Sequence, residues 1–152
     1  MRFSTKDITY YNQPFDHWVL DNFLDVNDAK KLSSQFIDFD NPTEEIIHYK
    51  GWIGEKRTCN RWDRFPPLTY STFSNLLSDK FIDKLSDITG ISPLYPDIGL
   101  HGGGWHMSGK GGSLAMHLDY SIHPKMNLQR KLNLIIYLEE DYDPEWGGSL
   151  QF

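Results

Sequence analysis

His117 and Asp119 are separated by a single residue in the stretch LAMHLDYSIH, residues 114–123. This stretch is apolar and aromatic and predicts a β-strand, in which residues i and i+2 point to the same face. The imidazole and the carboxylate would then converge on one point, and both groups bind metal ions in proteins. Taken alone, a His-x-Asp pair is a weak signal, because such pairs often arise by chance.

Four of the six histidines fall between residues 101 and 123, and they are His101, His106, His117 and His123. For His101 and His123 a structural, hydrogen-bonded role is the favoured interpretation. A zinc site of mixed His and Asp ligands stays open, because both ligand types suit that ion. The nearby segment GWHMSGKG (104–111) resembles a phosphate-binding loop, but Gly111 stands where the motif needs a hydroxyl, so a nucleotide site is not expected.

The secondary structure expected to position these residues differs between the N-terminal and C-terminal parts of the chain. A strand or extended arm is expected over 15–24, and 38–67 is uninformative. Asp25 is the expected N-cap of a short helix, whose apolar side is Val26, Ala29, Leu32 and Phe36. A single helix is expected over 66–90, closed by Gly90. Glycine-punctuated strands follow, which predicts an α+β fold.

Composition narrows the classes of function. A chain of 152 residues suits one domain, and a net charge of -6 argues against nucleic acid and anionic lipid as partners. Cys59 is the single cysteine, which excludes an internal disulfide and a thiolate zinc cluster. No membrane segment is recognised, so we expect a cytoplasmic protein.

A longer pattern surrounds the His-x-Asp pair. In residues 111–150, GGSLAMHLDYSIHPKMNLQRKLNLIIYLEEDYDPEWGGSL, the pair is followed by Arg130, an apolar run ending in Tyr137, an acidic and aromatic turn, and Gly-Gly-x-Leu. This segment resembles the core of the iron(II) and 2-oxoglutarate-dependent oxygenases, specifically the prolyl 4-hydroxylase-like group. The resemblance implies a double-stranded β-helix, or jelly-roll, with N-terminal helices packed on it. One domain over 1–152 would comprise a helical support region, 1–95, and the first jelly-roll strands, 96–152.

The resemblance also implies roles for individual residues. His117 and Asp119 would be two of the three ligands of Fe(II), and Tyr137 would hold the distal carboxylate of 2-oxoglutarate, unless it is simply a core aromatic. Asn133 would line the same pocket, on the face of Tyr137 by strand alternation. Met107 occupies a place where many prolyl hydroxylases carry a second tyrosine, and His106 beside it would substitute as a polar contact. The implied cofactors are Fe(II), 2-oxoglutarate and ascorbate.

The family's third iron ligand, a histidine, and the basic residue that follows it do not occur before Phe152. We therefore expect the chain to be a piece of a longer protein, with an incomplete jelly-roll. The expected activity is hydroxylation of a C–H bond in a peptidyl substrate, such as a prolyl residue, or in a small molecule, using O2 and releasing succinate and CO2. Neither the substrate nor the oligomeric state follows from the sequence.

Two alternatives remain open at this stage. The chain could be a catalytically inactive remnant that binds metal weakly through two ligands. It could instead be a carbohydrate-binding module on a β-sandwich, with an aromatic platform made from Trp52, Trp62, Trp105 and Trp146.

Overall fold

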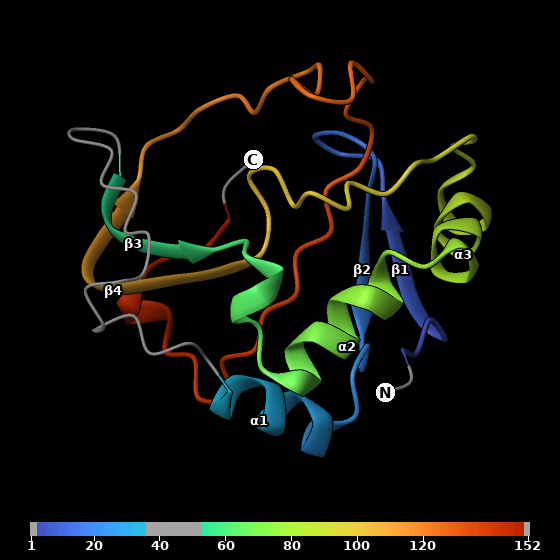
Figure 1. Ribbon diagram of the computed structural model, residues 1–152. Coiled ribbons are helices and arrows are strands. Elements are labelled where there is room, and N and C mark those ends of the chain that lie inside the picture. Colours follow the sequence, from blue (N-terminus) through green and yellow to red (C-terminus); the bar gives the residue numbers. More distant parts are fainter. Residues whose placement is uncertain (1–2, 36–52, 151–152) are drawn as a thin grey trace. The chain divides into compact units, whose positions relative to one another are not determined.

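The computed structural model describes residues 3–35 and 53–150, whose helices and strands are labelled in Figure 1. The chain divides into two compact units. Unit 1 comprises Met1–Phe36 and Tyr137–Phe152, and unit 2 comprises Ile37–Ile136. The helical region expected over 1–95 contains three strands as well as helices. One oxygenase domain over 1–152 stays a prediction.

Unit 1 opens with a β-hairpin. Strand β1 (Asp7–Tyr11) pairs antiparallel with β2 (His17–Asp21). Strand β2 lies inside the extended segment that the sequence predicts over 15–24. Its partner β1 was not expected, because its apolar residues are few and the pairing is set by the register across the turn.

Helix α1 (Val26–Ser34) follows β2 and begins as predicted. Asp25 is its N-cap, and its carboxylate accepts a hydrogen bond from the Asn27 N–H at 2.9 Å. Leu32 is buried, whereas Val26 is 62% exposed, so Val26 does not belong to the buried face that the sequence predicts. Phe36 lies outside the described residues.

Unit 2 has two helices where the sequence predicts one over 66–90. Helix α2 (Pro67–Leu76) and helix α3 (Asp79–Thr89) are separated at Ser78, whose extended backbone (φ -70°, ψ 147°) caps α3. Its hydroxyl donates to the Asn75 carbonyl at 2.7 Å. A Ser-Asp pair is a helix start signal, and here it overrides the continuous apolar spacing. Gly90 ends α3 in the left-handed region, as predicted (φ 70°).

Aromatic packing joins α2 to the second sheet. Strand β3 (Ile53–Cys59) pairs antiparallel with β4 (Trp105–Leu114), and the buried Trp105 lies opposite the buried Cys59. The Trp105 ring packs edge-on against Phe73 of α2, with centroids 6.2 Å apart, and Phe73 stacks on Phe65 at 4.9 Å. This cluster fixes where β4 begins, and β4 leads directly into the His-x-Asp segment.

The glycine-rich part of β4 contains an irregularity in the strand pairing. Gly54 pairs with Ser113, but Lys56 pairs with Ser108, so the register shifts across the glycines between these serines. Glycine in a strand commonly marks such a bulge, because it has no side chain to pack.

The predicted jelly-roll is not present in the described part of the chain. After β4, pairing between residues 115 and 150 is limited to an isolated bridge, Ile122–Gln129, and the strands expected at 114–123, 130–140 and 147–152 do not form there. His117 and Asp119 therefore lie on irregular chain, not on a strand. A strand needs neighbours for its N–H and C=O groups, and β4 finds only β3 among the described residues. The result is a mixed helix and strand fold with small sheets, compatible with a partial oxygenase domain.

We predict that Gly104→Ala destabilises the protein much more than Gly90→Ala. Both glycines have positive φ, +98° and +70°, but only at Gly104 would a Cβ clash with the Cys59 carbonyl oxygen and lie 2.9 Å from the Asn60 Cα. Gly90→Ala should cost about 1 kcal/mol of unfolding free energy and Gly104→Ala more than about 2 kcal/mol, because overlap adds to backbone strain. Urea unfolding of both variants measures the difference, and equal losses would contradict this account of the β3–β4 contact.

Candidate functional site

His117 and Asp119 converge although no strand aligns them. The His117 Nε2 lies 3.4 Å from the Asp119 Oδ1. The two residues follow β4 in an irregular stretch, so local chain geometry brings the side chains together, not strand alternation. Both side chains are partly open to solvent, with exposed fractions of 36% and 50%.

The hydrogen bonding of the His117 ring decides what its Nε2 can do. Its Nδ1 lies 2.8 Å from the Ala115 carbonyl oxygen, which can only accept, so Nδ1 carries the proton. In the neutral ring, Nε2 then carries a lone pair and can only accept a hydrogen bond. It faces a carboxylate oxygen, which can also only accept. Two such atoms repel each other unless a proton or a cation lies between them.

The separation of these atoms suits a shared metal ion. Two ligand atoms that each lie about 2.1 Å from one ion, at a right angle, are about 3 Å apart, close to the observed distance. The pair therefore fits two adjacent positions of an iron site of the two-His-one-carboxylate type. Within residues 3–35 and 53–150, no group of three or more His, Cys, Asp or Glu side chains is placed to hold a metal.

Arg130 holds the other oxygen of the carboxylate. Its Nη1 lies 3.1 Å from the Asp119 Oδ2, and its side chain is 22% exposed. The guanidinium carbon also lies 4.8 Å from the centre of the Tyr120 ring, a cation–π arrangement. The sequence pattern contains Arg130 but gives it no role, because the pairing depends on a turn between residues 121 and 130.

That turn is built around His123. Its ring is buried, and its Nδ1 accepts the backbone N–H groups of Lys125 and Met126 at 3.1 and 3.0 Å. Its Nε2 faces the Asp97 Oδ2 at 3.2 Å, and the rings of His101 and Tyr120 pack against it. These contacts agree with the structural role expected of His101 and His123.

His106 and Met107 project from β4 to opposite faces of the sheet. His106 pairs with Thr58 and Met107 with Arg57, so His106 shares its face with Lys56, two residues before Thr58. Desolvation lowers the pKa of His106, and the nearby Lys56 ammonium lowers it further. The two predicted cosubstrate contacts therefore do not face one common pocket.

Lys56 is a residue of the site that sequence reasoning missed. Its side chain is half-buried, and desolvation lowers its pKa while the Asp119 carboxylate raises it in part. Lys56 thus lies within electrostatic reach of the His117–Asp119 pair. It comes from the stretch 38–67, which is uninformative in sequence, and the β3–β4 register pairs it with Ser108.

Asn133 and Tyr137 lie on a segment without regular structure, so the strand alternation expected to align them does not apply. Both side chains are exposed, and Tyr137 reaches an exposed fraction of 68%. The two residues belong to different units. Their contact with 2-oxoglutarate stays a prediction.

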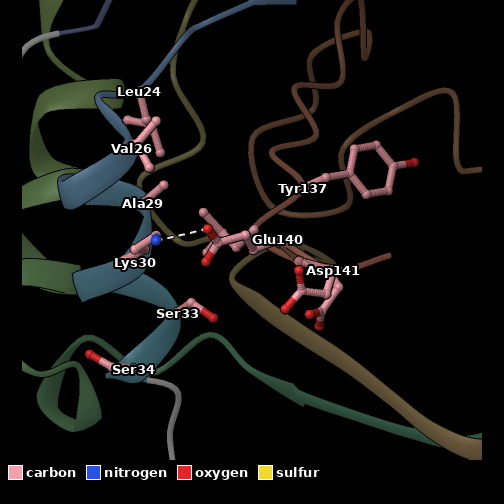
Figure 2. A pocket seen from close by; sticks show the side chains of 11 residues that line it. Leu24, Val26, Ala29, Lys30, Ser33, Ser34, Tyr137, Glu140 and Asp141 are labelled. Carbon is pink, nitrogen blue, oxygen red and sulfur yellow. Dashed lines mark ion pairs between the residues drawn. The ribbon is translucent and has the colours of Figure 1, made fainter. Parts of the chain in front are cut away.

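Tyr137 borders an open cleft of unit 1, between α1 and residues 137–141 (Figure 2). Lys30 of α1 pairs with Glu140 at 2.8 Å, and Figure 2 shows the Tyr137 ring directed away from this pair. Asp141 adds a further carboxylate to the wall. A dicarboxylate would meet repulsion from these groups, so the cleft does not suit 2-oxoglutarate.

Two of the four tryptophans expected to form the aromatic platform of the carbohydrate-binding alternative, Trp105 and Trp62, make other contacts. Trp105 is only 7% exposed and belongs to the core beside Phe73. Trp62 is half-buried, and its Nε1 donates to the Ile98 carbonyl at 2.8 Å. Trp146 is 65% exposed but lies in unit 1, in the 3-10 helix η2 (Pro144–Trp146), and Trp52 lies outside the described residues.

One of the comparisons with known proteins gives a match. Residues 103–152 match the family model described as the 2OG-Fe(II) oxygenase superfamily, and the match includes His117, Asp119 and Arg130. It covers about a third of the chain and supports an oxygenase that uses Fe(II) and 2-oxoglutarate, at the level of the superfamily. No curated protein and no solved structure matches the chain. None of the helices in the described ranges is long and apolar enough to cross a membrane.

We predict that Lys56→Met raises the pKa of His106. The ammonium beside the ring opposes its protonation, so its removal should move the pKa back toward the usual value of about 6.5. A folded-state pKa below the unfolded value means that stability falls as pH drops below about 6.5, and the fall should be shallower in the variant. NMR titration of the imidazole measures the shift. Lys125→Met, at an exposed lysine, is the control, and equal His106 values in both variants would refute the coupling.

Proposed function

We propose that the protein is an Fe(II)/2-oxoglutarate-dependent dioxygenase that hydroxylates a C–H bond. The observation that carries this proposal is the His117–Asp119 pair, whose Nε2 and Oδ1 atoms lie 3.4 Å apart inside the segment that matches the oxygenase superfamily. A hydrogen-bonded structural pair would place a donor against an acceptor. The Ala115 carbonyl accepts the hydrogen bond of the His117 Nδ1–H, so in the neutral ring the Nε2 lone pair is directed at Asp119 and is open for a cation.

In this proposal the side chains of His117 and Asp119 hold the metal ion in a defined arrangement. His117 would bind Fe(II) through Nε2, with the Ala115 carbonyl fixing the ring's tautomer and orientation, and Asp119 would bind through Oδ1. When bound, Fe(II) with 2-oxoglutarate and O2 supplies the oxidation that converts C–H to C–OH and releases succinate and CO2. The third protein ligand is not among the residues that the structure describes.

We propose that 2-oxoglutarate binds beside His106 and Lys56. The two residues share a strand face, and the Asp119 carboxylate raises the pKa of Lys56 in part, which supports this choice of face. A lysine with its ammonium partly desolvated is suited to a carboxylate. Tyr137 and Met107 remain proposed contacts from the resemblance, and Asn133 remains one from the strand alternation expected in the sequence.

The finer assignments are also part of the proposal. A prolyl 4-hydroxylase-like enzyme would act on a peptidyl substrate, such as a prolyl residue, or on a small molecule, and would use ascorbate to stay active. These details rest on the pattern of residues 111–150. Substrate choice is generally decided by loops around a site of this kind.

We predict that the full-length protein releases succinate from 2-oxoglutarate when supplied with Fe(II) and ascorbate, and that His117→Ala lowers the rate by more than about 100-fold, because a ligand of the reacting metal is lost. Succinate is measured by mass spectrometry with a panel of peptides and amino acids. His17→Ala is the matched control, because His17 makes the same kind of ring contact, to the Phe15 carbonyl at 2.9 Å, in the other unit.

Three outcomes are distinguishable. Succinate that depends on His117 but not on His17 supports the dioxygenase. Metal binding that depends on His117, without succinate from any substrate in the panel, indicates the inactive remnant. Succinate no greater than in a metal-free blank, with no metal bound, would refute the proposal and leave a sugar-binding role to be tested.

A further inference from the structure

The two oxygens of the Asp119 carboxylate face different partners. Oδ1 faces the His117 Nε2 at 3.4 Å, and Oδ2 lies 3.1 Å from the Arg130 Nη1. A carboxylate with both oxygens free can bind a metal through one oxygen or through both. With Arg130 on Oδ2, the carboxylate presents a single oxygen toward His117.

Arg130 is anchored so that it can hold this position. Its backbone N–H donates to the Ser121 carbonyl at 2.8 Å, next to the Ile122–Gln129 bridge. The side chain is 22% exposed and lies over the Tyr120 ring. Arg130 is therefore held at its backbone by Ser121 and at its guanidinium by the Tyr120 ring. Its Nη1 is directed at Asp119.

The ring beneath Arg130 is itself fixed. The Tyr120 hydroxyl donates to the His101 carbonyl at 2.9 Å, and the ring meets the buried His123 edge-on, with centroids 5.8 Å apart. His123 in turn faces Asp97 and accepts two backbone N–H groups. A continuous set of contacts thus runs from buried residues through Tyr120 to Arg130 and Asp119.

We propose that Arg130 is a positioning residue that holds Asp119 in a one-oxygen binding mode, with Tyr120 as its platform. This inference rests on the proposed function, because it concerns the ion that His117 and Asp119 would share. A carboxylate that binds through one oxygen occupies one position of the ion and leaves the others for the remaining ligands, cosubstrate and O2. Hydrogen-bonded partners that orient metal ligands typically contribute about 10- to 100-fold in metal affinity.

A role in folding alone would have a different signature. Asp119 is 50% exposed, and ion pairs at such positions contribute little to stability. The loss of Arg130 should therefore weaken metal binding much more than it lowers the melting temperature. Lysine is a poor substitute, because an ammonium can neither stack on Tyr120 nor present a planar edge to the carboxylate.

The test measures Co(II) binding to the full-length protein, without 2-oxoglutarate, by calorimetry and by visible absorption. Arg130→Met should weaken binding by about 10- to 100-fold and shift the absorption bands of the bound Co(II), because the freed Oδ2 changes the coordination. Arg130→Lys should restore only part of the affinity. Arg61→Met is the matched control, since Arg61 makes a comparable ion pair with Asp63, at 2.7 Å, that does not involve the proposed ligands. The Arg61→Met variant should bind Co(II) as the unmodified protein does.

Each result has one meaning. Unchanged Co(II) affinity and bands in Arg130→Met would overturn the positioning role, while binding that still depends on His117 would leave the proposed metal site standing. If Arg130→Met does not fold, Arg130→Lys decides, and affinity equal to that of the unmodified protein overturns the role. Co(II) binding that is absent, or unaffected by His117→Ala, would overturn the metal site and this inference with it.

Discussion

The carboxylate of Asp119 is the point on which the candidate site depends, because it is shared between an imidazole nitrogen and a guanidinium. Each partner has its own local support, the Ala115 carbonyl for His117 and the Tyr120 ring for Arg130. All of these residues lie between positions 115 and 130. Closing so short a loop costs little conformational entropy compared with pairing distant strands. His117 and Asp119 can therefore converge without the neighbouring strands of a barrel.

The rest of unit 2 determines where this loop begins. The aromatic cluster around Phe73 packs against Trp105, and Gly104 allows the chain to pass close to the Cys59 carbonyl as β4 starts. The β3–β4 register then places Lys56 and His106 on one face. The half-buried Lys56 ammonium on this face is within electrostatic reach of the Asp119 carboxylate, and its burial arises from the packing of the core rather than from the loop itself.

Local signals were the predictable part of the fold. The Asp25 cap and the glycine that ends α3 act through hydrogen bonds and backbone conformation within a few residues, so the sequence alone reveals them. The break at Ser78 carries a local signal too, but the apolar spacing across it predicts one continuous helix. The expected strands after residue 114 did not form in the described chain, because alternating apolar residues indicate a strand only where a neighbour supplies its hydrogen bonds.

In the candidate site, too, local features could be predicted from the sequence and long-range contacts could not. The sequence predicts the convergence of His117 and Asp119 from strand alternation, but the two side chains meet through the local geometry of an irregular loop. Lys56 is distant in sequence from His106, and the β3–β4 register places the two on one face. The ion pair of Arg130 with Asp119 needs the turn around His123. Neither could be read from a motif, since no local pattern records which distant residues a turn or a register shift will bring together.

The central claim is that one metal ion is bound by both His117 and Asp119. Pulsed electron paramagnetic resonance of Mn(II) bound to protein labelled with 15N in its histidines tests it most directly, because it detects an imidazole nitrogen that ligates the ion. The account predicts a 15N coupling that disappears in His117→Ala and persists in His17→Ala. A spectrum of bound Mn(II) without any nitrogen coupling, or with a coupling that survives the loss of His117, would contradict it.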